Sequence, residues 1–179
     1  MSTYIILLRG INVSGQKMIR MEELRRHIAG CGALNVRTYI QSGNVVCEHP
    51  VKTSRQLGGI VEESLARKLG YRVTALVVSA KELAAIAGQN PFDKKLPEFG
   101  SRMYVCFFEN KSPPAAIASI QSYVSAGERL IVKGAAGYAY YANGLGRAKL
   151  SHAVIERKLG LTTMRNWNTV TALLELAGQ

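Results

Sequence analysis

Acidic residues are scarce in this chain. Of its 179 residues, 12 are Asp or Glu and 23 are Lys or Arg, which gives a formal net charge of +11. Asp93 is the single aspartate, so the clustered carboxylates that two-metal nucleases and phosphotransferases use as ligands are missing. The positive charge favours an anionic partner such as nucleic acid or a nucleotide, although a solvated basic surface that only keeps the protein soluble would have the same composition.

Cysteine and histidine are also sparse. Cys31, Cys47 and Cys106 are odd in number and form no CxxC pair, which argues against a disulfide framework and a zinc knuckle. His27 and Cys31 are four residues apart, but no second pair completes a metal site, so we expect no metal and no cofactor. No Ser/His/Asp or Cys/His order is evident. Whether the chain is an enzyme stays open, and any catalysis would depend on positioning and cationic stabilisation.

No apolar run approaches the length of a membrane span, and the first residues lack the charged start of a signal peptide. We therefore expect a cytoplasmic protein with no membrane partner. Its oligomeric state cannot be deduced from the sequence.

The most informative stretch runs from Leu7 to Gly15. The apolar residues from Tyr4 to Leu8 predict a buried strand, and a loop with two glycines leads to a helix predicted to start around Met18. A strand, a glycine loop and a helix N-terminus together favour an anion site, here flanked by Arg9 and Lys17. A Walker phosphate loop is excluded by spacing. In that motif Lys and then Ser or Thr directly follow the second glycine, whereas here Gly15 is followed by Gln16-Lys17-Met18. The alternative is a turn in which the glycines only satisfy backbone geometry.

Local patterns in the first half predict the order βαββαβ. Apolar spacing, capping boxes and glycine stops predict the strands and helices that follow the first loop. They are a helix ending near Gly30, strands at 35–40 and 44–47 joined by Gln41-Ser42-Gly43, a helix from Thr53 to Gly70, a strand at 72–78 and a helix from Ser79 to Gly88.

The same order recurs in the second half, where Ser112 is predicted to cap a helix that begins at Pro113. The other predicted elements are strands at 103–108, 130–132 and 138–141, a helix at 150–159, a strand at 161–164 and a helix at 169–177. We therefore predict an α+β fold of two tandem βαββαβ ferredoxin-like subdomains, with antiparallel sheets and helices packed on one face. Residues 1–88 and 101–179 would be the subdomains, and 89–100 the linker.

A βαββαβ unit invites comparison with the RNA-recognition motif, which stacks bases on aromatic residues of its central strands. The third strand of the first half has no aromatic residue. The second half offers Tyr104, Tyr138, Tyr140 and Tyr141, but without the glycine–aromatic series of that motif. These tyrosines could be a base platform or simply core and rim residues.

Seven polar or aromatic residues are the candidate ligand contacts, because they fall at predicted loops that could converge on one cleft. They are Arg9, Asn12, Ser42, Asn44, Arg165, Asn166 and Trp167. Arginine beside an indole and amides suits a planar anionic ligand. Asn and Ser are equally typical of turns and helix caps.

The motifs Arg9-Gly10-Ile11-Asn12-Val13, residues 38–45, Asn90-Pro91-Phe92 and residues 165–170 resemble a bacterial family, domain of unknown function 1697. The resemblance implies two ferredoxin-like subdomains and no established activity. Its signature positions here would be the seven candidates and Gly43. Ser14 stands where the family usually has glycine.

The leading hypothesis is a binding protein for nucleic acid or a nucleotide that uses basic and polar loops. An alternative is an enzyme that acts on a phosphorylated small molecule in a cleft between the subdomains. A third possibility is an interaction module without a ligand.

Overall fold

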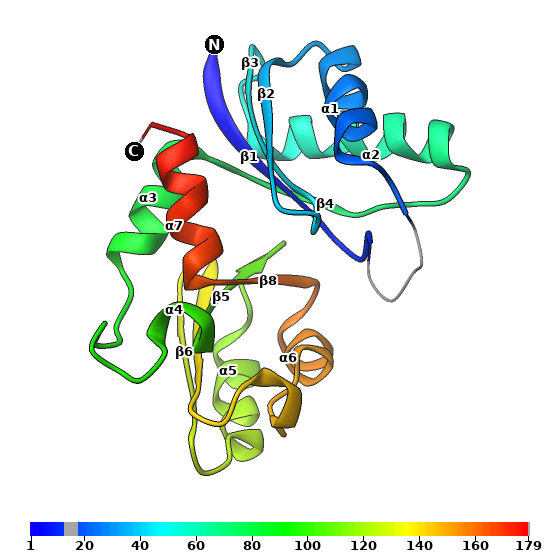
Figure 1. Cartoon of the computed structure of the whole chain (residues 1–179). Helices are drawn as coiled ribbons and strands as arrows, with labels where there is room; N and C mark the ends of the chain where they lie inside the picture. The colour runs from blue at the N-terminus through cyan, green and yellow to red at the C-terminus, as the bar shows by residue number, and fades with distance from the viewer. Residues whose placement is uncertain (13–17, 179) are drawn as a thin grey trace. The chain divides into compact units, whose positions relative to one another are not determined.

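The computed structural model describes residues 1–12 and 18–178 (Figure 1). The chain folds into two compact units. Unit 1 comprises residues 1–85 and 172–179, and unit 2 comprises residues 86–171. Each unit contains a four-stranded antiparallel sheet, and the predicted βαββαβ order is present in both halves. The chain has the predicted α+β fold. The subdomain boundaries given above remain a prediction.

The sheet of unit 1 has the order β2-β3-β1-β4. Its elements are β1 (Ser2–Leu8), α1 (Met21–Gly30), β2 (Leu34–Tyr39), β3 (Asn44–His49), α2 (Ser54–Leu69), β4 (Ala75–Ser79) and α3 (Ala80–Gly88). Alternate residues of β1 point to opposite faces of the sheet. Ile6 and Leu8 pack with Leu24 of α1 and Val61 of α2 in one apolar core.

Local capping signals explain α2 and α3, the two helices that follow α1 in unit 1. Thr53 precedes α2 and its hydroxyl accepts the backbone N–H of Gln56 at 3.2 Å, while Gly70 ends the helix with φ +75°. Before α3, the Ser79 hydroxyl accepts the N–H of Glu82, and the Glu82 carboxylate accepts the N–H of Ser79. This reciprocal pair is the predicted capping box.

Unit 2 repeats the topology with the sheet order β6-β7-β5-β8. Its elements are α4 (Phe99–Arg102), β5 (Met103–Phe108), α5 (Pro114–Ile120), a 3-10 turn η1 (Gln121–Tyr123), β6 (Glu128–Lys133), β7 (Ala136–Tyr141), a second 3-10 turn η2 (Leu145–Arg147), α6 (His152–Leu159), β8 (Thr162–Asn166) and the first half of α7 (Trp167–Leu176), whose residues from Ala172 on belong to unit 1. Cys106, Ile120 and Ile155 belong to one core on the helix-bearing face of this sheet.

Several boundaries differ from the sequence predictions. The first helix begins at Met21, with Arg20 as its N-cap. Ser112 does not cap α5, because its hydroxyl donates instead to the Leu159 carbonyl at 2.8 Å in the interior, and Pro113 is the N-cap. The last strand extends two residues beyond Met164, because Asn166 still pairs with Tyr104 of β5. No helix in the described part of the chain is long and apolar enough to span a membrane.

Candidate functional site

The end of β1 and the β2–β3 hairpin form the first group of candidate residues. The Leu8 N–H donates to the Gly43 carbonyl at 2.8 Å, and Gly43 has φ +76°. A Cβ atom on Gly43 would lie 2.8 Å from Leu8 Cβ and 2.9 Å from Ile11 Cδ1. Glycine therefore lets the hairpin tip pack directly on the end of β1. We call Arg9, Asn12, Ser42 and Asn44 the hairpin group.

Asn12 holds the backbone in this group. Its Nδ2 donates to the Ile19 carbonyl at 3.0 Å and to the Gln41 carbonyl at 2.8 Å, and its Oδ1 accepts the Ile19 N–H at 2.8 Å. Its φ of +53° is one that Asn tolerates better than most residues. The side chain thus fastens the segment after β1 to residue 19 and to the hairpin.

Asn44 is fully buried, and its Nδ2 donates to the Ser42 hydroxyl at 2.9 Å and to the Tyr39 carbonyl at 3.3 Å. Ser42 is exposed and Arg9 is half-buried. Arg9 and Ser42 are therefore the members of the hairpin group that a ligand reaches most directly. The predicted anion loop also included Gly15 and Lys17, which lie outside the described residues.

Arg165 is a strand residue of unit 2, whereas the sequence placed it in a loop after the last strand. It pairs with Val105, so it lies on the same face of the sheet as Tyr138. Its Nη1 donates to the Thr163 hydroxyl at 2.7 Å and to the Met164 carbonyl at 2.9 Å. Burial lowers the pKa of Arg165 to about 10, so the guanidinium stays charged at neutral pH.

Asn166 and Trp167 stand at the junction of β8 and α7. The Asn166 Oδ1 accepts the Thr169 N–H at 3.0 Å, so this residue caps α7. The Asn168 carboxamide lies over Gly100, where an added Cβ atom would collide with it.

The Trp167 ring is half-buried and has two neighbours from the segment that the sequence treated as a linker. Phe99 meets it edge-on with the ring centroids 5.5 Å apart. The Lys94 Nζ lies 5.7 Å from the indole centroid, within the range of a cation–π contact. We call Lys94, Phe99 and Trp167 the indole group. Sequence reasoning missed Lys94 and Phe99, because no local pattern links residues so far from Trp167.

The tyrosines of unit 2 are buried or half-buried, which argues against an open base-stacking platform. Tyr138 and Tyr140 are 0% and 3% exposed. The Tyr138 hydroxyl donates to the Ile86 carbonyl at 2.7 Å, and the Tyr140 hydroxyl donates to the Pro97 carbonyl at 2.9 Å. The backbone carbonyls of Ile86 and Pro97 are thus hydrogen-bonded to these tyrosines.

Two histidines and one cysteine, His49, His152 and Cys106, have structural surroundings. His49 Nε2 lies 3.1 Å from the Cys31 carbonyl oxygen, and His152 Nε2 lies 2.9 Å from that of Thr162. Burial raises the pKa of the Cys106 thiol to about 12, so little reactive thiolate forms at neutral pH. Within residues 1–12 and 18–178, no three His, Cys, Asp or Glu side chains are grouped to hold a metal ion.

Comparisons with known proteins identify a family but no activity. Residues 1–138 match the family described as protein of unknown function (DUF1697). A conserved bacterial protein from Streptococcus pneumoniae has a similar structure, with a TM-score of 0.72, 21% sequence identity and 98% coverage of both chains. At this identity the similarity indicates the fold alone. Among curated proteins no sequence matches. The motif around Trp167 lies beyond the residues that the family match covers.

Proposed function

We propose that this chain, which belongs to the family described as protein of unknown function (DUF1697), binds an anionic ligand of the nucleic-acid or nucleotide class. The observation that carries the proposal is the indole group, where a lysine ammonium lies 5.7 Å from the centroid of a half-buried tryptophan ring. In unit 1, Arg9 of the hairpin group is a separate basic candidate contact for a strand.

Charge supports an anionic ligand. The chain has 23 Lys or Arg against 12 Asp or Glu. Arg26 and Arg67 pair with glutamates one helical turn away, but both pairs are exposed and contribute little to holding those side chains in place. An excess of cations over carboxylates attracts polyanions and makes their binding dependent on salt.

The indole group adds a feature that a diffuse basic surface lacks. Stacking of a base on an aromatic side chain is worth about 1–3 kcal/mol and tolerates any base. The Lys94 ammonium, which lies over one face of the ring, can pair with the phosphate of the same nucleotide. The T-shaped contact with Phe99 orients the indole ring, which lowers the entropy lost when a base stacks on it.

Trp167 is the single tryptophan of the chain, so its fluorescence reports directly on this group. The experiment titrates labelled single-stranded RNA and DNA at low and near-physiological salt, and follows anisotropy together with tryptophan quenching. We expect both signals to saturate at the same concentration. Lys94→Ala and Arg9→Ala should each weaken binding about fivefold or more, as expected for a lost charge-assisted contact of about 1 kcal/mol or more.

Lys111→Ala is the matched control, because Lys111 is an exposed lysine of the same unit and its loss changes the net charge equally. Equal weakening by Lys94→Ala and Lys111→Ala, without quenching, would show that only diffuse charge attracts the strands and would contradict the proposal. Quenching by mononucleotides without strand binding would move the ligand class to small phosphorylated molecules.

A further inference from the structure

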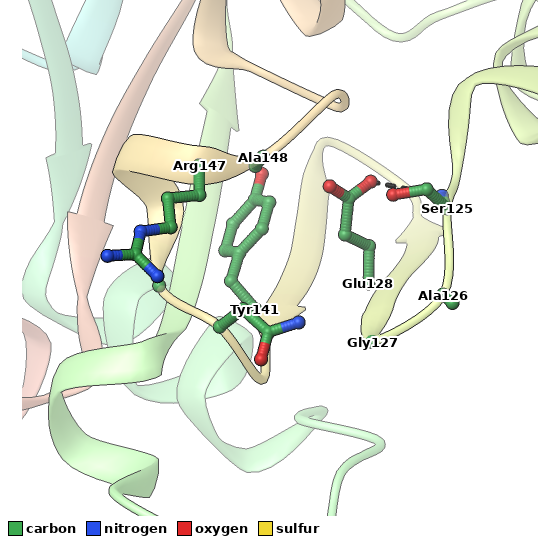
Figure 2. A pocket seen from close by; sticks show the side chains of 9 residues that line it. Ser125, Ala126, Gly127, Glu128, Tyr141, Arg147 and Ala148 are labelled. Carbon is green, nitrogen blue, oxygen red and sulfur yellow. Dashed lines mark hydrogen bonds between the residues drawn. The ribbon is translucent and has the colours of Figure 1, made fainter.

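We propose that a small polar pocket in unit 2 binds a single phosphate group, at a place separate from the hairpin and indole groups. The pocket has a volume of about 60 Å³ and is formed where the start of β6 meets the segment after β7 (Figure 2). The lining residues that the argument uses are Gly127, Glu128, Tyr141, Asn143, Gly144 and Arg147.

Two side chains at this pocket have donors available for a ligand. Arg147 and Asn143 are both exposed. Neither side chain makes a hydrogen bond or ion pair with another residue in the described part of the chain. A guanidinium has five N–H donors in a planar fork that matches the oxygens of a phosphate, and a carboxamide adds two more.

Glu128 also lines the pocket, but its carboxylate is occupied. Its oxygens accept the backbone N–H groups of Lys149 at 2.7 Å, Ser125 at 3.0 Å and Leu150 at 3.2 Å. Figure 2 shows the Tyr141 ring between this carboxylate and the Arg147 guanidinium. The three N–H groups offset the repulsion between the carboxylate and a bound anion. The Arg147 guanidinium forms no ion pair with this carboxylate in the described part of the chain, so it can pair with the anion.

Glycine and volume restrict what can enter. Gly127 and Gly144 have φ +82° and +80° and place no side chain in the pocket. A volume of about 60 Å³ has room for a few water-sized groups. This suits one tetrahedral oxyanion, so a nucleotide or strand would place a phosphate here.

The choice of phosphate over other oxyanions rests on the proposed function, but the test does not need a nucleic acid. Inorganic phosphate is titrated at constant ionic strength, with chloride as the balancing anion, while backbone amide NMR signals are followed. We expect saturable shifts at Gly127, Gly144 and Asn143. Arg147→Ala should weaken the phosphate affinity at least tenfold, and Arg147→Lys should weaken it less, because charge remains but the fork is lost.

Arg129→Ala is the control, since Arg129 is an exposed arginine of β6 and carries the same charge. Shifts that are linear in phosphate, or equal losses with Arg129→Ala and Arg147→Ala, would overturn the inference. If phosphate saturates the pocket but strands do not bind, this inference stands and the proposed function fails. If strands bind with quenching of Trp167 while phosphate produces no saturable shift, the reverse holds.

Discussion

The two units share a strand order but differ at the hairpin that joins their second and third strands. In unit 1 the glycine of the β2–β3 hairpin, Gly43, lies against Leu8 and Ile11, and an added Cβ atom would approach both within 3 Å. In unit 2 the glycine of the β6–β7 hairpin, Gly134, has φ +61° and no atom within 4 Å of an added Cβ. A shared topology therefore fixes where a hairpin lies but not whether its tip is packed.

The two sheets also differ in the side chains on one face, the face that carries Ile5 in unit 1 and Tyr138 in unit 2. In unit 1 that face presents aliphatic residues such as Ile5 and Leu7, which are fully buried. In unit 2 it presents Tyr138 and Tyr140, whose hydroxyls donate to the backbone carbonyls of Ile86 and Pro97. The same fold thus holds two chemically different sheet faces.

The largest expected effect comes from filling the packed hairpin. Gly43→Ala should destabilise the protein by about 3 kcal/mol, because it combines a left-handed residue with a Cβ atom pressed against Leu8 and Ile11. Gly134→Ala has only the backbone penalty, about 1 kcal/mol. Urea denaturation of both variants measures the difference. Equal losses would show that the hairpin tips are packed alike.

The fold could be predicted because its signals are local. Each helix end is marked by residues close to it in sequence. Thr53 caps the start of α2 and Gly70 its end, and the pair Ser79 and Glu82 caps the start of α3. Alternation and turn residues mark the hairpins equally well. For this reason the element order was predicted correctly, while most ends were off by one to three residues.

The candidate site was harder to predict, because its geometry depends on distant pairs. Arg165 and Asn166 resemble a polar loop, yet pairing with β5 extends the strand through them. No local sequence pattern predicts the contact between Lys94 and Trp167, because the two residues are far apart in the chain. The ligand-binding role of the seven candidate residues stays a prediction. Four of the candidates form side-chain hydrogen bonds to backbone groups of their own units: Asn12, Asn44, Arg165 and Asn166. These structural bonds alone would explain why asparagine stands at three of the positions.

A second comparison sets the loop amide of unit 1 against the helix cap of unit 2. Asn12→Ala removes three hydrogen bonds to Ile19 and Gln41 and leaves alanine at φ +53°, so a loss of about 2 kcal/mol is expected. Asn166→Ala removes one cap bond to Thr169, which should cost about 1 kcal/mol. Both are measured by urea denaturation.

Asn12→Gly separates the two contributions in unit 1, because glycine accepts the positive φ but makes none of the bonds. Stability equal to wild type in Asn12→Gly would contradict the bracing role of the amide. Stability as low as in Asn12→Ala would assign the loss to the hydrogen bonds alone.

The smallest expected effect is on the loss of folding stability at acidic pH. Burial opposes ionisation of both Glu128 in unit 2 and Glu82 in unit 1, but hydrogen bonds to their carboxylates win and lower the pKa of each. A carboxyl whose pKa is lower in the folded state stabilises the protein above its unfolded pKa of about 4.3, and that stabilisation is lost as pH falls through the folded pKa. Each glutamate should therefore add to the loss of stability between pH 5 and pH 3.

Glu128→Gln should flatten this acid slope more than Glu82→Gln. The Glu128 oxygens accept three backbone N–H groups, which cannot rotate to another acceptor when the charge is removed. Two of the three donors to Glu82 are the hydroxyls of Ser54 and Ser79, which can turn to water. With solvent screening, the Glu128 substitution should cost about 1 kcal/mol at pH 7 and little at pH 3. Urea titrations from pH 3 to pH 7 measure the slopes, and a steeper residual slope in Glu128→Gln than in Glu82→Gln would place the stronger carboxylate anchor in unit 1 instead.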